Sequence, residues 1–368
     1  MSTPLRITKG SLFLYYCFDI ADEIALDKIE KIFGEAPTES RLVCERLTPE
    51  YVQYRKVPLL VYLEQSDLKT RSLNLRAECR AKIYDFGVVT IIFKIPIMEE
   101  TLTTLSQLSA AVVANEEIRN AAEHQMERLR REIEPAIAHP QTNAEAWEDY
   151  AIFVVQNFDS PLSVHEILES HAGEIAKTLL AEVDRLSEAE LSDAVKNPLS
   201  YYENELAFID WHAAFLYDPR MSYDVPDVLE YAVTMLLELR TYDAILDDTL
   251  ETAYQDLEGR ASPWSLSPYA STIGYLSQVK LDVSEVIEKA TNSLKLVGDL
   301  YLAKVYSAAA ARFSLDSWEK SVREKLQTIE SIYDVLYERT TTRRLLVLEV
   351  FIVILFVIDI FLIFFERK

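Results

Sequence analysis

The chain has 368 residues, of which 49% are hydrophobic and 26% are charged, and its formal net charge is −23 at pH 7. These proportions are typical of a globular protein with a packed core, and they exclude a chain that is disordered throughout. Because non-specific binding to nucleic acid depends on clustered lysine and arginine, the negative charge argues against a nucleic-acid-binding protein.

The glycine and cysteine content indicates the fold class and the compartment of the protein. The chain has only seven glycines, whereas average proteins contain about 7% glycine, so mostly helical structure is favoured over a fold with many tight turns. Cys17, Cys44 and Cys79 are widely spaced and odd in number, which is typical of reduced thiols in a reducing compartment. Residues 1–23 lack a long apolar run and a small-residue cleavage site, so a secretory signal is not expected.

The first part of the chain alternates between predicted strands and helices. Strand patterns occur at residues 11–21, 57–64, 73–97 and 147–158. The third of these turns at Asp85-Phe86-Gly87, which favours a hairpin. Helical spacing follows the first strand up to Gly34, and a long helix is predicted from residue 98 until prolines end it. We therefore expect a compact α+β domain over residues 8–220.

Almost everything from Pro226 onward predicts helix. Helical periodicity runs to about residue 258, a loop follows at 259–271, and a second helix is predicted over 272–305. A third segment carries apolar residues at spacings of three and four, which fit a coiled-coil seam: Leu315, Trp318, Val322, Leu326, Ile329, Ile332 and Leu336. Residues 226–340 are thus predicted to form a stalk, either as a helical hairpin within one chain or as a coiled coil between chains.

The last predicted element is a transmembrane helix over residues 345–365. This stretch is apolar except for Glu349 and Asp359, and 21 helical residues span about 31 Å, the thickness of the hydrocarbon core. Its apolar residues favour insertion by roughly 6 to 11 kcal/mol, whereas two acids oppose it by at most about 3 kcal/mol each. Because only three residues follow, we expect a tail anchor that leaves the preceding domains on the cytoplasmic or matrix side.

The two acids in this stretch are the predicted site residues. Glu349 and Asp359 lie about 15 Å apart along the helix axis and about 80° apart around it. Intramembrane acids are functional candidates by default, and a single span needs a partner to cover them; the alternative is that the bilayer tolerates both. Arg343 and Arg344 are expected at the membrane interface.

The sequence lacks four common motifs of nucleotide binding, zinc binding and serine hydrolysis. It contains no Gly-x-Gly-x-x-Gly, Gly-x-x-x-x-Gly-Lys, His-Glu-x-x-His or Gly-x-Ser-x-Gly pattern. His165 and His171 are six residues apart, so they do not share a helix face. Acid pairs such as Asp247 and Asp248 are expected on solvated helix faces. No catalytic, cofactor-binding or metal-ligating residue is therefore predicted, and no cofactor.

The order of elements resembles the Required for Meiotic Nuclear Division family, a domain of unknown function with bacterial, fungal and mitochondrial members. The resemblance covers most of the chain and is sharpest at the end, where Leu348-Glu349 and Ile358-Asp359 match a Leu-Glu and an Ile-Glu ten residues apart. The family's histidine before the span is missing here, and Val350 replaces its tryptophan. The resemblance implies a membrane-attached homo-oligomer and no established catalytic activity.

The sequence therefore favours a tail-anchored, oligomeric scaffold or tethering protein that displays an acidic α+β domain. The expected partners are the lipid bilayer, further copies of the chain and an unidentified protein. A bacterial inner membrane is the expected location, with the mitochondrial inner membrane as the alternative. Two other functions stay open: an enzyme or RNA- or nucleotide-binding protein with a site in the α+β domain, and an oligomeric bundle that uses the acids for ion or proton passage.

Overall fold

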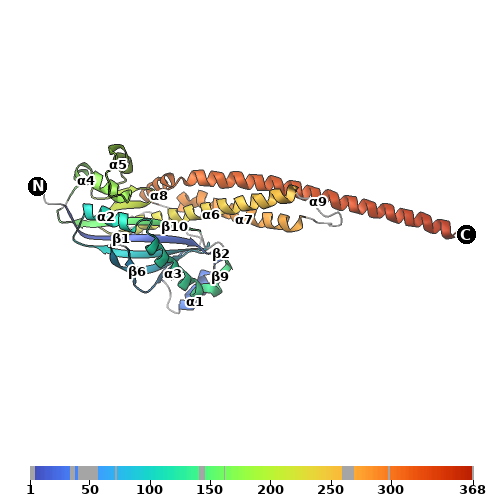
Figure 1. Cartoon of the computed structure of the whole chain (residues 1–368), viewed down its shortest axis with the longest axis horizontal. Coiled ribbons are helices and arrows are strands. Elements are labelled where there is room, and N and C mark those ends of the chain that lie inside the picture. The colour runs from blue at the N-terminus through green and yellow to red at the C-terminus, as the bar shows by residue number, and fades with distance from the viewer. Residues whose placement is uncertain are drawn as a thin grey trace. The chain divides into compact units, whose positions relative to one another are not determined.

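The computed structural model of the chain describes residues 5–33, 38–39, 57–70, 73–140, 146–160, 162–258, 269–296 and 299–366 (Figure 1). These residues fall into two compact units. The first unit contains the described residues within 1–238 and 292–316, and the second contains those within 239–291 and 317–368. Gly34 and Cys44 lie outside the described residues, as does most of the predicted loop at 259–271.

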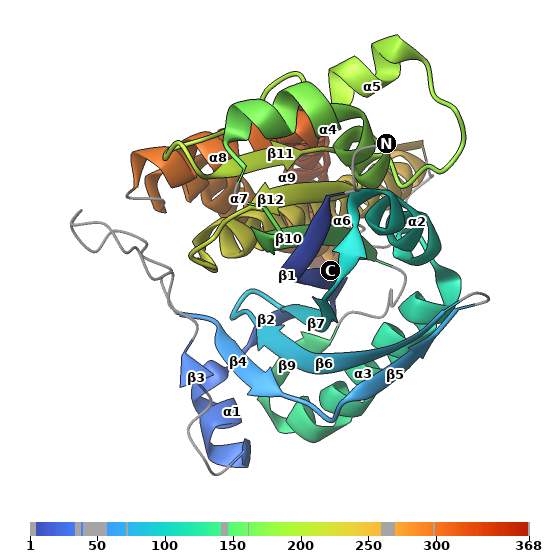
Figure 2. The same ribbon diagram turned by 90° about the vertical axis from the view of Figure 1, so that its left-hand side faces the viewer.

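Within the described residues, a sheet of ten strands forms the centre of the first unit. Its strands are β1 (Arg6–Asp19), β3 (Thr38–Glu39), β4 (Leu59–Tyr62), β5 (Ser66–Lys69), β6 (Asn74–Ile83), β7 (Val88–Ile97), β8 (Glu100–Thr101), β10 (Trp147–Phe158), β11 (Leu206–Ile209) and β12 (Ala213–Tyr217). The order is β11-β12-β10-β1-β7-β6-β4-β3, seen from top to bottom in Figure 2, while β5 pairs with β6 and β8 with β1. Strands β10 and β12 are parallel, and the other pairs are antiparallel. A separate small sheet joins β2 (Ala21–Ile24) to β9 (Ile137–Pro140).

Strand β1 lies in the middle of the large sheet because its side chains are almost all apolar. It pairs with β10 on one side and with β7 on the other, and residues 12–18 are buried on both faces. Gly10 is required where β1 approaches β10, since a Cβ atom there would lie 2.7 Å from the carbonyl oxygen of Val154. The β6–β7 hairpin requires Gly87, whose φ is 97° and whose Cβ would lie 1.5 Å from the carbonyl oxygen of Ala21.

Helices contribute to an apolar core on one face of this sheet. They are α1 (Leu26–Phe33), α2 (Leu102–Val112), α3 (Glu116–Ile133), α4 (Val164–Leu179) and α5 (Glu188–Ala194). Side chains of β1 such as Leu14 and Tyr16 belong to the same core. Polar caps start the helices: Asn115 accepts hydrogen bonds at the start of α3, and Ser163 and Glu166 form a reciprocal capping box on α4. The apolar faces of these helices and the alternate residues of the strands thus meet in one layer.

The opposite face of the sheet packs against two helices, α6 (Asp224–Glu258) and α8 (Leu300–Arg312). Helix α6 begins in the first unit, and α8 lies entirely within it. Nζ of Lys82 on β6 lies 2.8 Å from Oδ1 of Asp227 and 2.5 Å from Oε2 of Glu230, both near the start of α6. At the end of α8, Nε of Arg312 donates to Oδ1 of Asp210 at 2.7 Å. Ion pairs therefore tie both helices to the sheet.

The second unit is helical throughout its described residues. It contains the remainder of α6, most of α7 (Ala270–Leu296) and nearly all of α9 (Leu315–Glu366). Five apolar residues of the predicted seam are buried in this unit: Val322, Leu326, Ile329, Ile332 and Leu336. Nζ of Lys325 lies 2.9 Å from Oδ1 of Asp243 and 2.7 Å from Oδ2 of Asp247, which joins α9 to α6. The seam thus packs inside one chain, and a coil between chains stays a prediction.

The prediction of a mixed α+β domain followed by a helical region is confirmed, but three boundaries were wrong. The helix predicted from residue 98 is two helices, because Ala114 adopts a φ of 51° and Asn115 then caps α3. The helix predicted over 272–305 divides before Asp299, which caps α8. Residues 22–24, which were predicted to start the first helix, belong to β2 (Ala21–Ile24).

The described residues also bear on the predicted transmembrane helix at 345–365. In the part of the chain that the structure describes, no helix combines the length and the apolar character that crossing a membrane requires. These residues therefore give the predicted span no support.

Candidate functional site

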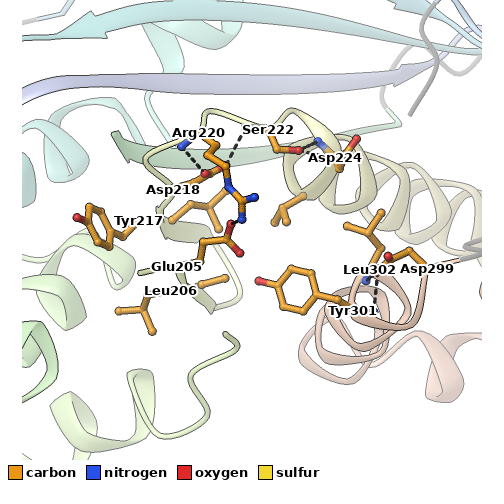
Figure 3. Close-up of a pocket in the computed structure, with 13 residues that line it drawn as sticks. Glu205, Leu206, Tyr217, Asp218, Arg220, Ser222, Asp224, Asp299, Tyr301 and Leu302 are labelled. Carbon is orange, nitrogen blue, oxygen red and sulfur yellow. Dashed lines mark hydrogen bonds and ion pairs between the residues drawn. The ribbon is translucent and has the colours of Figure 1, made fainter. Parts of the chain in front are cut away.

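A hollow in the first unit opens between β11, β12, the start of α6 and the start of α8 (Figure 3). Its cavity volume is about 60 Å³, which is well below the roughly 300 to 1,000 Å³ of pockets that enclose drug-sized molecules. Its lining combines an apolar floor with charged groups: Glu205, Leu206, Ala207, Leu216, Tyr217, Asp218, Arg220, Ser222, Asp224, Val225, Asp299, Tyr301 and Leu302.

Arg220 occupies the centre of this hollow. Its guanidinium forms an ion pair with Glu205, and Figure 3 shows the two side chains facing each other. The guanidinium carbon also lies 4.0 Å from the centre of the Tyr202 ring, a cation–π contact. Hydrogen bonds to Glu205 and Tyr202 raise the pKa of Arg220 above its usual value, so this side chain is a permanent cation held in one place.

A tight turn before α6 positions Arg220. Oδ1 of Asp218 accepts from the backbone N–H of Arg220 at 2.9 Å, and its Oδ2 accepts from the N–H of Ser222 at 2.7 Å. Met221 between them has a φ of 54°, so the chain bends sharply there. The Ser222 hydroxyl then donates to Oδ2 of Asp224, the first residue of α6, at 2.6 Å.

The start of α8 forms the facing wall. Oδ1 of Asp299 accepts from the backbone N–H groups of Tyr301 and Leu302 at 2.7 and 3.0 Å. This cap fixes the first turn of α8, and the ring of Tyr301 points toward the middle of the hollow in Figure 3. Two helix starts, each with an aspartate, therefore border the same space.

Charged side chains and hydroxyl groups line part of the hollow. Four carboxylates and one guanidinium line it, together with two tyrosines and a serine, and neither histidine nor cysteine is among its lining residues. The hydroxyl nearest to a possible base is that of Ser222, which donates to Oδ2 of Asp224. Among the described residues of the whole chain, no group of His, Cys, Asp and Glu is arranged to hold a metal ion.

The domain that carries this sheet matches a known family. The model of the "Uncharacterized protein MJ0711, N-terminal domain" family aligns with residues 9–224, more than half of the chain. The chain belongs to this family. The aligned region ends at the first residue of α6, so it contains Glu205, Arg220 and Ser222 of the hollow, while Asp299 and Tyr301 follow it. The match does not confirm the Required for Meiotic Nuclear Division family.

One curated relative of this MJ0711 family aligns with the chain. It is the uncharacterized protein MJ0711 of Methanocaldococcus jannaschii, which is 23% identical over 216 residues. The alignment covers 58% of this chain and 65% of that protein. No solved structure matches the chain.

The predicted site residues lie on α9 in the second unit. Glu349, Asp359 and Arg344 are exposed, and Arg343 is half-buried. They lie on or beside residues 345–365, which we call the apolar run. Its exposed large side chains are Leu345, Leu346, Leu348, Val350, Phe351, Ile352, Val353, Ile354, Leu355, Phe356, Val357, Ile358, Ile360 and Leu362. The roles predicted for the four charged residues stay predictions.

Sequence reasoning missed the hollow. Its charged residues come from four separate segments, and nothing in their spacing predicts that they meet. Two local signals existed: Asp218-Pro219 is a turn dipeptide, and Asp299 precedes an apolar helical segment as an N-cap would. Both signals predict where helices begin, but neither predicts that the two starts border one space.

Proposed function

We propose that this protein is a membrane-attached binding protein, in which the apolar run of α9 embeds in lipid and the α+β unit binds a partner or ligand. The observation that carries this proposal is the exposure of the apolar run. Its fourteen exposed large side chains have exposed fractions between 46% for Ile352 and 64% for Phe351 and Phe356. Soluble monomers rarely leave so much contiguous apolar surface in water.

The distribution of these side chains around the helix favours lipid over a protein as the covering medium. A helix that packs against one partner shows an apolar stripe and a polar opposite face. Here residues 350–358 are apolar and exposed without interruption, so apolar side chains point in every direction. Lipid surrounds a helix on all sides, whereas one partner helix covers a single face.

The energetic balance of this embedding is narrow. Fourteen apolar side chains at roughly −0.3 to −0.6 kcal/mol each favour lipid by about 4 to 8 kcal/mol, and each acid opposes it by up to about 3 kcal/mol. Arg343 and Arg344 stand at the start of the run, where arginine side chains reach lipid headgroups. Because Arg367 and Lys368 follow the run, the two arginines do not by themselves set the orientation of the preceding domains.

Flotation of the purified full-length protein with phosphatidylcholine vesicles tests the embedding. Leu355→Arg places a charge in the middle of the run and is expected to lower the vesicle-bound to free ratio on the order of a hundredfold. Val335→Arg is the matched control, since Val335 is also an exposed apolar residue of α9 but precedes the run. Equal flotation of wild type and Leu355→Arg, or none by either, would overturn the proposal.

The hollow around Arg220 supports a second candidate function, the binding of a small ligand by the α+β unit. Arg220 and Tyr301 are fixed by Glu205 and by the α8 cap, so the hollow is already formed without a ligand. A thermal-shift screen of amino acids, nucleotides and polyamines against wild type and Tyr301→Ala would test it. A compound that stabilises wild type alone supports the candidate, and no stabilisation by any class contradicts it.

A further inference from the structure

We infer that the α+β unit binds single-stranded nucleic acid on the part of its sheet that α6 leaves open. This surface consists of six residues, which we call the open strip: Tyr62 on β4, Arg76, Glu78 and Arg80 on β6, Lys94 on β7, and Tyr223 just before α6. Figure 2 shows β4, β6 and β7 side by side in the sheet. The inference goes beyond the proposed function, since it requires neither the embedding in lipid nor the hollow around Arg220.

The exposure of successive side chains shows where the cover of α6 ends. Lys82, Arg80 and Glu78 alternate along β6 and therefore point to the same face of the sheet. The exposed fractions of their side chains are 4%, 21% and 53% in that order, because Lys82 lies beneath the start of α6 and the other two lie progressively farther along the strand. On β7 the exposure changes in the same way, from buried Thr90 to half-buried Lys94. This end of the face is therefore open to solvent.

Positive charge gathers on the open strip although the chain is strongly acidic. The strip holds three cations and one carboxylate, whereas the whole chain has a net charge of −23. Oε2 of Glu78 lies 3.0 Å from Nη2 of Arg80 and 4.0 Å from Nζ of Lys94, so two cations share one acid. Asp67 and Lys69 on β5 add one charge of each sign beside the strip. The fold thus separates a basic surface from an acidic chain, and such a surface complements a polyanion.

Arg76 offers a guanidinium group to an incoming phosphate. Its Nε donates to Oε1 of Gln65 at 3.0 Å, and it forms no ion pair with any described residue. Arginine binds phosphate oxygens with two parallel hydrogen bonds, which are stronger than hydrogen bonds between neutral groups. Arg80 follows four positions later on the same strand, about 13 Å away. The strip therefore presents two guanidinium groups along β6, with the ammonium group of Lys94 on the next strand.

Two exposed tyrosines favour nucleic acid over an acidic protein segment. Tyr62 and Tyr223 are 62% and 42% exposed. The guanidinium carbon of Arg80 lies 5.2 Å from the centre of the Tyr62 ring, and the ring of Tyr223 makes an edge-to-face contact with Phe13 at 6.0 Å. Both rings are thus held in place and keep exposed surface on which a base can stack. An acidic peptide would use the cations but leave these rings without a planar partner.

The flat face of a sheet selects single strands over a duplex. A duplex turns its base edges into grooves, which admit a helix or a two-stranded ribbon, and its stacked bases do not reach rings on a sheet. The bases of a single strand are free to stack on the tyrosines while its phosphates contact the cations. RNA and DNA share both features, so the predicted ligand is single-stranded nucleic acid of either kind.

Fluorescence anisotropy of a labelled oligouridine of about 12 nucleotides tests this inference with the full-length protein in a non-ionic detergent. The salt is about 0.1 M, because charges farther than about 10 Å are then screened and the acids elsewhere on the chain count little. Tyr62→Ala is expected to weaken binding on the order of tenfold by removing one stacking surface, whereas Tyr62→Phe should bind as wild type does. Tyr254→Ala is the matched control, since Tyr254 is an exposed tyrosine in the second unit.

Arg76→Gln tests the contact with phosphate. Each cation that binds a phosphate of a single strand releases a counterion, so this substitution should lower the slope of log affinity against log salt by about 0.7. Arg131→Gln is the control, because Arg131 is an exposed arginine of α3 on the other side of the sheet. It should change neither the affinity nor the slope. Circular dichroism of each variant checks that the fold is kept.

The outcomes separate this inference from its alternatives and from the proposed function. Absence of binding by wild type, or equal binding by wild type and Tyr62→Ala, overturns it. Displacement of the label by a glutamate homopolymer as effectively as by unlabelled oligouridine also overturns it, in favour of an acidic protein partner. Binding of an oligothymidine of the same length supports DNA as well as RNA as the ligand. Tyr62→Ala should float with vesicles as wild type does, and failure of every variant to float overturns the embedding alone.

Discussion

Lys82 and Glu230 form a buried ion pair across 148 positions of sequence, with Nζ of Lys82 2.5 Å from Oε2 of Glu230. Both side chains are almost entirely buried, at 4% and 0% exposure. Asp227 accepts a second hydrogen bond from Lys82 at 2.8 Å, and the Tyr84 hydroxyl donates to Oε1 of Glu230 at 3.0 Å. One cation and two carboxylates thus join β6 to the start of α6.

Removing the cation from this network is expected to destabilise the first unit strongly. Lys82→Met leaves two carboxylates without their shared partner, and breaking a buried pair in this way costs about 3 to 5 kcal/mol. Urea unfolding followed by circular dichroism measures the loss. Lys94→Met is the control, because Lys94 is partly exposed and its ion pair with Glu78 is loose, with Nζ as far as 4.0 Å from Oε2. A loss no larger than that of the control would contradict this account of the network.

The same network predicts how stability responds to pH. Burial raises the pKa of Glu230; Lys82 lowers it and Asp227 raises it again, because two acids share one cation. An acid whose pKa is raised by folding contributes stability that is complete below its unfolded value, about 4.3, and is lost as the pH rises through the folded value. The glutamine of Glu230→Gln has no proton to lose, so the variant escapes this loss. The free energy of unfolding of the variant minus that of wild type should therefore increase as the pH rises from about 4 toward neutrality. A difference that stays constant with pH would contradict the raised pKa.

The buried cysteines should resist alkylation in the folded protein. Cys17 and Cys79 are buried free thiols. Burial raises the pKa of Cys79 to about 12, although a hydrogen bond with Ser66 lowers it in part. Burial also raises the pKa of Cys17 above its usual value. Because the thiolate is the reactive form, iodoacetamide at about pH 8 should label both only after unfolding. Peptide mass spectrometry of native and urea-treated protein checks this, and rapid native labelling at either residue would show that its surroundings open.

Local patterns predicted the elements of this fold better than their ends. The aromatic run of β1 and the Asp85-Phe86-Gly87 turn were found because strand period and turn chemistry depend only on neighbouring residues. The break between α2 and α3 was missed, since residues on both sides of Ala114 favour helix and only the left-handed φ of 51° separates them. Packing in the folded unit, rather than propensity, sets that break.

Long-range contacts explain why the site residues escaped prediction. Lys82 stands in a strand pattern and Glu230 in a helical one, and each by itself predicts a solvated charge. Only the packing of α6 on the sheet makes them a buried pair. The hollow around Arg220 has the same origin, because Glu205 and Tyr301 come from segments 96 positions apart that meet only in the folded unit. The spacing of residues along one sequence does not predict contacts between segments so far apart.

The arginines before the apolar run give the last prediction, which rests on the proposed embedding in lipid. Each basic residue beside an anionic membrane surface contributes about 1 kcal/mol, so replacing both Arg343 and Arg344 with Gln should weaken binding to vesicles containing phosphatidylserine about thirtyfold. The loss should shrink at high salt, because screening removes the attraction that the substitution also removes. Arg323→Gln is the control, since Arg323 pairs with Glu319 earlier in α9 and should leave binding unchanged. If the double variant lost as much binding to neutral phosphatidylcholine vesicles, the arginines would act on the helix itself rather than on anionic headgroups.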